Sequence, residues 1–431
     1  MNPKLNTVQE DLLQYLWRYQ KFSHAKLKTT KGVDLQILSP GFLNESVGPD
    51  FSNAKIRMDA LLWAGPVEVH VNASAWYQHG HHKDANYEAV ILHVVWHNDT
   101  DICLSNGQAM PTLCLSEYVA SAILDQYRAQ FLTPKRFIAC ENALPAFDTS
   151  KWLFWKERLY VERLEGQTKH IEYLLQQNTN NWEAVLFQML AKGVGINKNG
   201  AAFLEMAQSF SFAIIQKCQP NITYLEALFL GQLGLLEGHK DAYQQKLKSE
   251  YAFLKSKFKL KKSLENATTF GRLRPANFPT IRLAQLAQLY HIQQGLFEKL
   301  MKAQNTKQVR QYFNTATSSY WESHYNFEVK SKTSVKKMTP AFQDLLLVNV
   351  VIPLRFAYFK YQGKSHDMKL LQWAREIKAE HNALMNKFRA CNLKVKTVLD
   401  SQSLLHLKKQ YCDAQKCLRC AVGFHIMQKD V

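Results

Sequence analysis

"VGPDFSNAKIRMDALLWAGPVEVHVNASAWYQHGHH" (residues 47–82) contains two runs typical of neighbouring β-strands, "FSNAKIRMDALLW" and "GPVEVHVNA", with a predicted turn at 64–66. Asp50 begins the first strand. Glu68 and His70 point to the same face of the second, because side chains alternate along a strand. If the two strands pair as a hairpin, these three side chains converge. Three more histidines follow within a dozen residues: His79, His81 and His82.

The segments on either side of this stretch alternate between helix and strand patterns. Before it, 9–22 has apolar positions at helical spacing, 26–38 reads as two short strands around a turn, and 39–50 has the composition of a loop. After it, 82–90 is predicted as a short helix and 90–98 as a buried strand. This order predicts a mixed α/β domain over residues 1–145, in which a mixed sheet is flanked by helices.

The rest of the chain, 146–431, is predicted to be a basic, all-helical domain with a cysteine-rich C-terminal tail. From Trp152 onward, apolar residues recur three and four apart. Residues 1–150 hold 12 Lys and Arg against 15 Asp and Glu, whereas 151–431 holds 42 against 21. A polyanion that contacts both parts would explain this division. Solubility and solvated helix faces are the alternative explanation.

Two basic segments are candidate nucleic-acid contacts. Over 246–262 a buried apolar stripe is predicted, and off it lie Lys248, Lys255, Lys259 and Lys262. These lysines would contact phosphates whatever the base sequence, or would form a solvated helix face. Arg272 and Arg274 stand just before a Pro-rich turn, where they would bind phosphate or cap neighbouring carbonyls.

Composition indicates a folded cytoplasmic protein that does not enter a membrane. Hydrophobic residues make up 46% of the 431 residues. The most apolar stretch, 345–359, is interrupted by Asn349, Pro353 and Arg355, so we expect no membrane span. The N-terminus lacks the pattern of a secretory signal. Eight cysteines without an export signal indicate reduced thiols.

The carboxylates and imidazoles of residues 47–82 match the needs of a metal-dependent nuclease. Attack on a phosphodiester requires a cation that neutralises charge and acidifies a water. Oxygen ligands such as Asp50 and Glu68 suit Mg²⁺ or Mn²⁺. The pattern therefore predicts metal-dependent hydrolysis of phosphodiester bonds.

The same residues resemble the signature of PD-(D/E)XK, or restriction-endonuclease-like, nucleases. "GPDF" is followed by "EVH", with 17 residues between Asp50 and Glu68, and His70 stands where that signature has lysine. The continuation "VHVNASAWYQHGHH" is similar to a segment of very-short-patch mismatch-repair endonucleases. That resemblance implies a general-base histidine, for which His79 and His81 both qualify. It also implies an assisting glutamate on the N-terminal helix, matched by Glu10. Both resemblances imply an endo- or exonuclease that acts on DNA rather than RNA.

Over nearly its full length the chain resembles a family of uncharacterised bacterial proteins, a domain of unknown function. The segments that carry this resemblance are "GPDFSNAKI", "VEVH", "ILHVV", "RPANFPTIRLAQLA", "SQSLLHL" and "YCDAQKCLRC". It implies no established activity.

Two other functions stay open. His79, His81 and Asp84 have the side chains of a zinc hydrolase site. Alternatively, the chain is a non-catalytic nucleic-acid-binding protein with a degenerate nuclease fold, in which Pro-Asp is only a turn and Glu-x-His an exposed pair. His93, inside an apolar strand, is predicted to be a core histidine.

The C-terminal tail has the spacing of a metal site. Cys412-x4-Cys417-x2-Cys420 supplies three thiolates, and the fourth ligand is His425 or a distant cysteine such as Cys391. The first choice gives a zinc site and the second an iron–sulfur site. Ordinary packing of three small buried residues is the alternative.

Overall fold

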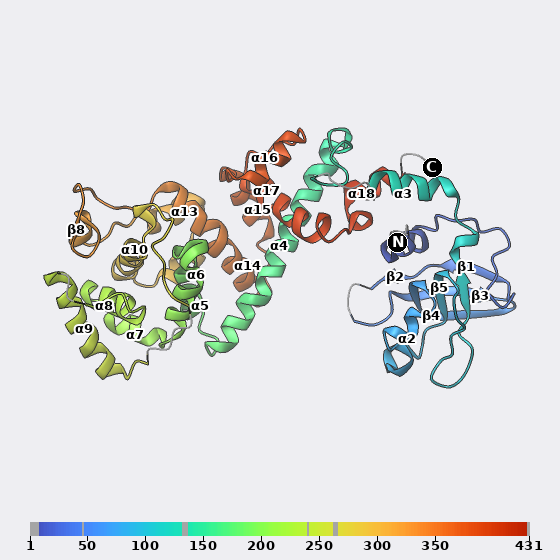
Figure 1. Ribbon diagram of the computed structural model, residues 1–431, viewed down its shortest axis with the longest axis horizontal. Helices are drawn as coiled ribbons and strands as arrows, with labels where there is room; N and C mark the ends of the chain where they lie inside the picture. The colour runs from blue at the N-terminus through green and yellow to red at the C-terminus, as the bar shows by residue number, and fades with distance from the viewer. Residues whose placement is uncertain (1–7, 45–46, 132–136, 239–240, 262–265, 429–431) are drawn as a thin grey trace, which may run out of the picture. The chain divides into compact units, whose positions relative to one another are not determined.

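The computed structural model describes residues 8–44, 47–131, 137–238, 241–261 and 266–428, which form two compact units (Figure 1). Unit 1 comprises residues 1–155, 386–393 and 405–431, and unit 2 comprises 156–385 and 394–404. The first part of the chain carries a mixed sheet, and the part that follows is mostly helical. At this level the fold predicted from the sequence is confirmed.

Unit 1 is built on a six-stranded mixed sheet with the order β1-β3-β4-β5-β6, in which β2 also pairs with β3. Strand β3 is antiparallel to β1, β2 and β4, whereas β4, β5 and β6 run parallel. The strands are β1 (Leu35–Ser39), β2 (Phe42–Leu43), β3 (Phe51–Met58), β4 (Leu61–Asn72), β5 (Leu92–His97) and β6 (Thr112–Cys114).

The hairpin between β3 and β4 turns earlier than predicted. Met58 pairs with Leu61, so the turn consists of Asp59 and Ala60, and Asp59 adopts the left-handed conformation (φ 49°) that such a turn needs. The predicted turn at 64–66 is wrong, because β4 runs straight through these residues. Pro66 is tolerated there because the pairing register shifts between Phe51 and Ala54 on the facing strand.

Helices and short turns pack against this sheet, and α1 and α2 both contact β4. Helix α1 has an acidic first turn and buries Leu12, Leu13, Leu16 and Trp17 in the core of the sheet. The short helix predicted at 82–90 is two 3₁₀ turns instead. The remaining elements of unit 1 are α1 (Glu10–Tyr19), α2 (Ala75–Gln78), η1 (His81–Lys83), η2 (Ala85–Tyr87), η3 (Leu115–Glu117), α3 (Ser121–Phe131), η4 (Leu144–Ala146), η8 (Lys408–Cys412), η9 (Cys417–Arg419) and α18 (Ala421–Gln428).

Unit 2 is a helical array around one large apolar core. Its elements are α5 (Trp182–Val194), α6 (Ile196–Gln208), α7 (Phe212–Cys218), α8 (Ile222–Gln232), α9 (Ala242–Phe258), η5 (Pro275–Asn277), α10 (Pro279–Ile292), α11 (Leu296–Lys302), α12 (Thr306–Phe313), η6 (Ser319–Glu322), β7 (His324–Asn326), β8 (Val329–Lys330), α13 (Pro340–Leu346), η7 (Leu347–Val351), α14 (Ile352–Tyr361) and α15 (Asp367–Glu376). Unit boundaries fall within α4 (Thr149–Gln177), α16 (Ala383–Ala390) and α17 (Val398–Leu407).

Among the residues that the structure describes, one helical segment, Pro340–Tyr361, is long and apolar enough to cross a membrane. It consists of α13, the π-helical turn η7 and α14. Within its most apolar window, 72% of the residues are buried inside the protein, and Arg355 lies among them with its guanidinium bonded to the Ala303 carbonyl at 3.2 Å. This burial is typical of a core helix.

The compact units do not follow the predicted domain boundary at 145/146. Residues 405–431 were assigned to the helical domain, but they belong to unit 1. The reason is packing, since Leu418 and Met427 are buried in the same apolar core as the sheet and α1. The cysteine-rich tail is therefore part of the N-terminal unit.

Candidate functional site

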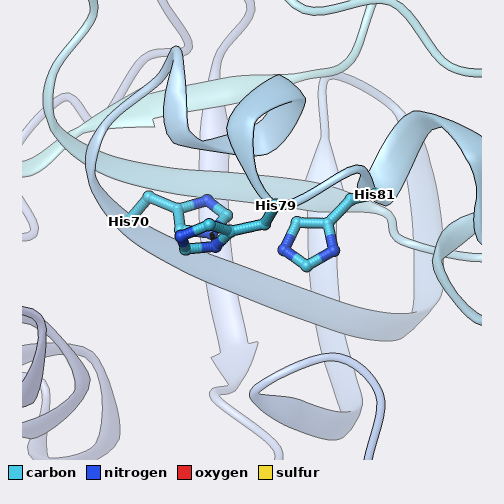
Figure 2. A group of neighbouring side chains, drawn as sticks. All are labelled: His70, His79 and His81. Carbon is cyan, nitrogen blue, oxygen red and sulfur yellow. Dashed lines mark hydrogen bonds between the residues drawn. The ribbon is translucent and has the colours of Figure 1, made fainter.

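The structure brings together Asp50, Glu68, His70, His79 and His81, where the start of β3 pairs with the second half of β4. Asp50 immediately precedes β3, and Glu68 and His70 lie on β4. Glu68 and His70 are buried, whereas the His79 side chain is exposed to solvent. Figure 2 shows the rings of His70, His79 and His81 gathered at one place, the first from β4 and the others from the segment around α2 and η1.

The two carboxylates are tied to each other through the backbone. The Asp50 amide donates to Glu68 Oε2 at 2.9 Å, and the Val69 amide donates to Asp50 Oδ2 at 3.1 Å. From α1, Gln14 Nε2 donates to Asp50 Oδ1 at 2.8 Å. A carboxylate has about four lone-pair positions, so both groups retain acceptor capacity for a cation.

Three histidines form a hydrogen-bonded chain from the core to the surface. His70 Nδ1 lies 2.9 Å from His93 Nε2, and His70 Nε2 lies 3.2 Å from His79 Nδ1. A neutral imidazole has one N–H, so His70 donates to one neighbour and accepts from the other. His93 is buried, as predicted, but it also orients the ring of His70.

Burial and like charge raise the pKa of both carboxyl groups. The pKa of Asp50 is raised first by burial and then by the charge of Glu10, whereas the Val69 amide and the Arg419 guanidinium lower it. The pKa of Glu68 is raised by burial and by Asp50. Burial also raises the pKa of Glu10, although His79 and Arg419 oppose that shift. Glu10 therefore belongs to the same electrostatic group.

Burial shifts the imidazoles in the opposite direction. It lowers the pKa of His70 to about 2, with further repulsion from His93, His81 and His79. It lowers the pKa of His93 to about 3 and that of His81 to about 4. These three rings are neutral near pH 7, which is the form that binds metal ions.

The side chains present fit a divalent cation. One ring nitrogen from each of His70, His79 and His81 lies within 4.8 Å of the others. His81 Nε2 is buried, has no hydrogen-bond partner among the described residues, and lies 3.4 Å from Glu68 Oε1. Asp84, by contrast, is occupied as the cap of η2, where it accepts from the Asn86 amide at 2.9 Å. A histidine site would thus use His70 where the sequence suggested Asp84.

Two residues of the site were missed by sequence reasoning. Gln14 binds Asp50, and Arg419 Nη2 donates to Gln14 Oε1 at 2.6 Å. A signal for Gln14 was present, because it is a polar residue within the buried stripe of α1. Arg419 lies 405 residues away in sequence from its partner, and no local pattern indicates that contact.

The basic residues lie in unit 2, on α9 and before α10. Lys255 and Lys259 are exposed, whereas Lys248 is half-buried and donates to the Gly238 carbonyl at 3.3 Å. Lys262 lies outside the described residues. Arg272 and Arg274 are both exposed at the turn that contains η5.

The three cysteines of the tail lie in η8 and at the two ends of η9, and His425 lies on α18 with its ring 5.3 Å from that of Phe147. All eight cysteines are described, and none forms a disulfide.

Comparison with known proteins identifies a family but no activity. The family model described as "Protein of unknown function (DUF2851)" matches residues 10–383. No curated protein and no solved structure matches the chain. The resemblance to uncharacterised bacterial proteins is thereby confirmed, and the resemblance to nucleases receives no support from these comparisons.

Proposed function

Since the chain belongs to the DUF2851 family, whose description gives no function, we propose one from the site: the protein is a metal-dependent nuclease that hydrolyses DNA phosphodiester bonds in the cytoplasm. The observation that carries the proposal is the meeting of three acidic side chains from separate segments, Glu10, Asp50 and Glu68, beside the exposed ring of His79.

The order of elements supports this proposal. Helix α1 is followed by strands β1 and β2 and then by the antiparallel pair β3 and β4. A segment that contains α2, η1 and η2 connects β4 to the parallel strand β5. The PD-(D/E)XK signature has the same order of groups, an aspartate followed by a second carboxylate two residues before the lysine position. In this chain Asp50 immediately precedes β3, and Glu68 lies on β4, the antiparallel partner of β3. The basic residues of unit 2 would supply contacts to the DNA backbone.

Asp50 and Glu68 would hold a Mg²⁺ or Mn²⁺ ion, which would neutralise phosphate charge and acidify the attacking water. His79 is placed to accept a proton, because its ring is exposed and its Nδ1 is fixed by His70, which leaves Nε2 toward solvent. His70 stands at the position of the lysine in the PD-(D/E)XK signature. Because it is neutral, His70 positions His79 and contributes no positive charge.

A zinc-dependent hydrolase is a second candidate function, and the histidine geometry favours it. The ligand nitrogens of His70, His79 and His81 lie within 4.8 Å of one another, and zinc commonly takes three histidines plus a water. Glu68 Oε1 lies 3.5 Å from His70 Nε2 and 3.4 Å from His81 Nε2, so it would be the acid–base partner of that water.

Cleavage assays with the Asp50→Asn variant test the nuclease proposal. The wild type is incubated with duplex DNA, single-stranded DNA and RNA in the presence of Mg²⁺, Mn²⁺ or a chelator. We expect metal-dependent cleavage of DNA. Asp50→Asn should reduce it to the metal-free level while DNA binding is retained, because affinity comes mostly from phosphate contacts elsewhere. His79→Ala should reduce cleavage by about 100-fold or more.

Asp125→Asn is the matched control, because Asp125 is exposed on α3 of the same unit. Equal loss in both variants would contradict the assigned role of Asp50. A wild type that retains zinc and cleaves no nucleic acid favours the zinc hydrolase. A wild type that binds DNA, holds no metal and cleaves nothing favours the non-catalytic alternative.

A further inference from the structure

Four cysteines of unit 1 lie on segments that pack against one another although their sequence positions are far apart. Three of them, Cys412, Cys417 and Cys420, belong to the tail, and the fourth is Cys140, which follows α3. We call them the four-cysteine group. Cys420 is buried and the others are half-buried.

Contacts on both sides of Cys140 fix its segment against the tail. Before it, the Phe137 ring lies 5.5 Å from Lys408 Nζ, at the start of η8. After it, the Phe147 ring lies 5.3 Å from the ring of His425 on α18. The segment that carries Cys140 therefore packs against η8, which ends at Cys412, and against α18, which begins directly after Cys420.

Backbone packing holds the tail cysteines in one tight turn. The Cys420 amide donates to the Cys417 carbonyl at 3.1 Å. Gly423 on α18 packs so closely on η9 that a Cβ atom there would overlap the Cys417 carbonyl. The loop between η8 and η9 is closed by a hydrogen bond of 2.8 Å from the Lys416 amide to the Tyr411 carbonyl.

The thiols are close enough to affect one another's ionisation. Burial and then Cys420 and Cys417 raise the pKa of Cys140, with Cys391 the weakest of the named neighbours. Burial and then Cys140 raise the pKa of Cys412. Burial and Cys420 raise the pKa of Cys417 to about 12. The same four thiols affect one another, which agrees with the packing of the segments that carry them.

We propose that the four-cysteine group binds one iron–sulfur cluster. A single zinc ion binds thiolates at about 2.3 Å, which places four sulfurs within about 4 Å of one another. Among the described residues, however, the set of ligand atoms within 4.8 Å is the histidine set and not the cysteines. Four thiolates that bind different iron atoms of a cluster stand farther apart. Cys140 is then the fourth ligand, in place of His425 or Cys391.

The cluster also acts on the candidate active site through Arg419, which is a positioning residue. Arg419 lies between two ligands, Cys417 and Cys420, and its guanidinium donates to Gln14, which in turn donates to Asp50. Arg419 also lowers the pKa of Asp50 and of Glu10. Loss of the cluster would release η9 and remove this support from Asp50. This second step rests on the proposed function, whereas the cluster itself does not.

Metal and sulfide analysis of the full-length chain, purified without oxygen, tests the cluster. We expect iron and acid-labile sulfide in equal amounts, with a broad visible absorption band. Cys140→Ser should lose most of the iron, whereas Cys391→Ser and the exposed Cys103→Ser should keep it. Zinc without sulfide, or no metal at all, would overturn the proposal. So would a Cys391→Ser variant that loses the iron while Cys140→Ser keeps it. Circular dichroism checks that each variant folds. If Cys140→Ser does not fold, the iron and sulfide content of the wild type is the deciding measurement for the cluster.

Arg419→Ala tests the coupling. We expect unchanged iron content and a Mn²⁺-induced rise in melting temperature that is smaller than in the wild type, with Arg419→Lys partly restoring it. An unchanged Mn²⁺ response would overturn the coupling and leave the cluster in place. Failure of the wild type to cleave DNA counts against the proposed function alone, because neither readout uses cleavage.

Discussion

At the scale of single residues, burial pushes both kinds of titratable group in the site toward their neutral forms. It raises the pKa of Asp50 and Glu68 and lowers the pKa of His70 to about 2. Neutral imidazoles are ready to bind a cation, but protonated carboxyls are not. Binding of Mg²⁺ or Mn²⁺ would therefore release protons from the carboxyl groups.

This coupling predicts how stability depends on pH and metal. A carboxyl whose pKa is raised on folding stabilises the protein fully below its unfolded pKa of about 4, and that contribution is lost as pH rises through the folded pKa. The metal-free protein should therefore lose this contribution as pH rises from about 4 to about 9. Above about pH 6.5 the histidines no longer oppose the loss, so net stability should fall there. Mn²⁺ should raise the melting temperature more at the alkaline end, where it binds ionised Asp50 and Glu68. Thermal melts with and without Mn²⁺ measure this.

Glu68→Gln provides the control, because it removes one titrating group at nearly constant shape. Its metal-free melting temperature should vary less with pH above about pH 6.5. The histidines do not interfere, since groups with a lowered pKa lose their contribution only as pH falls below about 6.5. A Mn²⁺ effect that is equal at both ends of the range would contradict the coupling.

How far the sequence predicted the site depends on how local each contact is. Strand alternation correctly placed Glu68 and His70 on one face, because it is a short-range rule. The predicted turn at 64–66, however, would have paired Glu68 with Leu62, and it is the observed turn at Asp59 and Ala60 that brings Asp50 beside Glu68. Gln14, Arg419 and Cys140 were not found. Their contacts close loops of tens to hundreds of residues, and no periodicity in the sequence encodes such closure.

At the scale of elements, β4 carries the site, because it pairs with β3 on one side and β5 on the other and contacts α1 and α2. Gly65 permits part of this packing. A Cβ atom at Gly65 would lie 2.6 Å from Ile91 Cγ2 and 3.0 Å from the Ala89 carbonyl oxygen. The segment that leads into β5 thus approaches β4 more closely than any side chain allows.

We predict that Gly65→Ala lowers the free energy of unfolding by about 1–3 kcal/mol, the usual cost of overpacking. Because Glu68 lies three residues further along β4, DNA cleavage should fall as well. Gly166→Ala is the control, and it should raise the free energy of unfolding. It is exposed on α4 with open space at its Cβ position, so alanine should stabilise by about 0.5–1 kcal/mol. Urea unfolding of both variants measures these effects. If Gly65→Ala leaves the free energy of unfolding unchanged, then β5 shifts without loss of stability.

At the scale of the whole molecule, the sequence predicted a mixed sheet followed by a helical part. It did not predict which segments of the chain belong to each compact unit. Periodicity separated the sheet from the helices, and the charge count placed 42 of the 54 Lys and Arg after residue 150. The return of 405–431 to unit 1 was not foreseen. It depends on apolar residues such as Leu418, which is buried in the core of unit 1. The spacing of such residues in the sequence does not indicate whether they pack in the core of unit 1 or of unit 2.

The basic residues of unit 2 should control affinity for DNA. We predict that replacing Lys248, Lys255, Lys259 and Lys262 by Gln flattens the log–log dependence of duplex binding on salt, by roughly 0.9 for each phosphate that the variant no longer neutralises. Lys248 is the weakest of these candidates, because it is half-buried and bonded to the Gly238 carbonyl.

The control must remove the same charge from another surface of unit 2, since net charge alone also affects binding. Four exposed lysines outside α9 serve this purpose: Lys307, Lys364, Lys378 and Lys394. Binding is measured by fluorescence anisotropy at several salt concentrations. If α9 contacts the phosphates, its variant changes the slope and the control variant mainly shifts the affinity at each salt concentration. Equal slopes in the two variants would show that α9 is a solvated helix face.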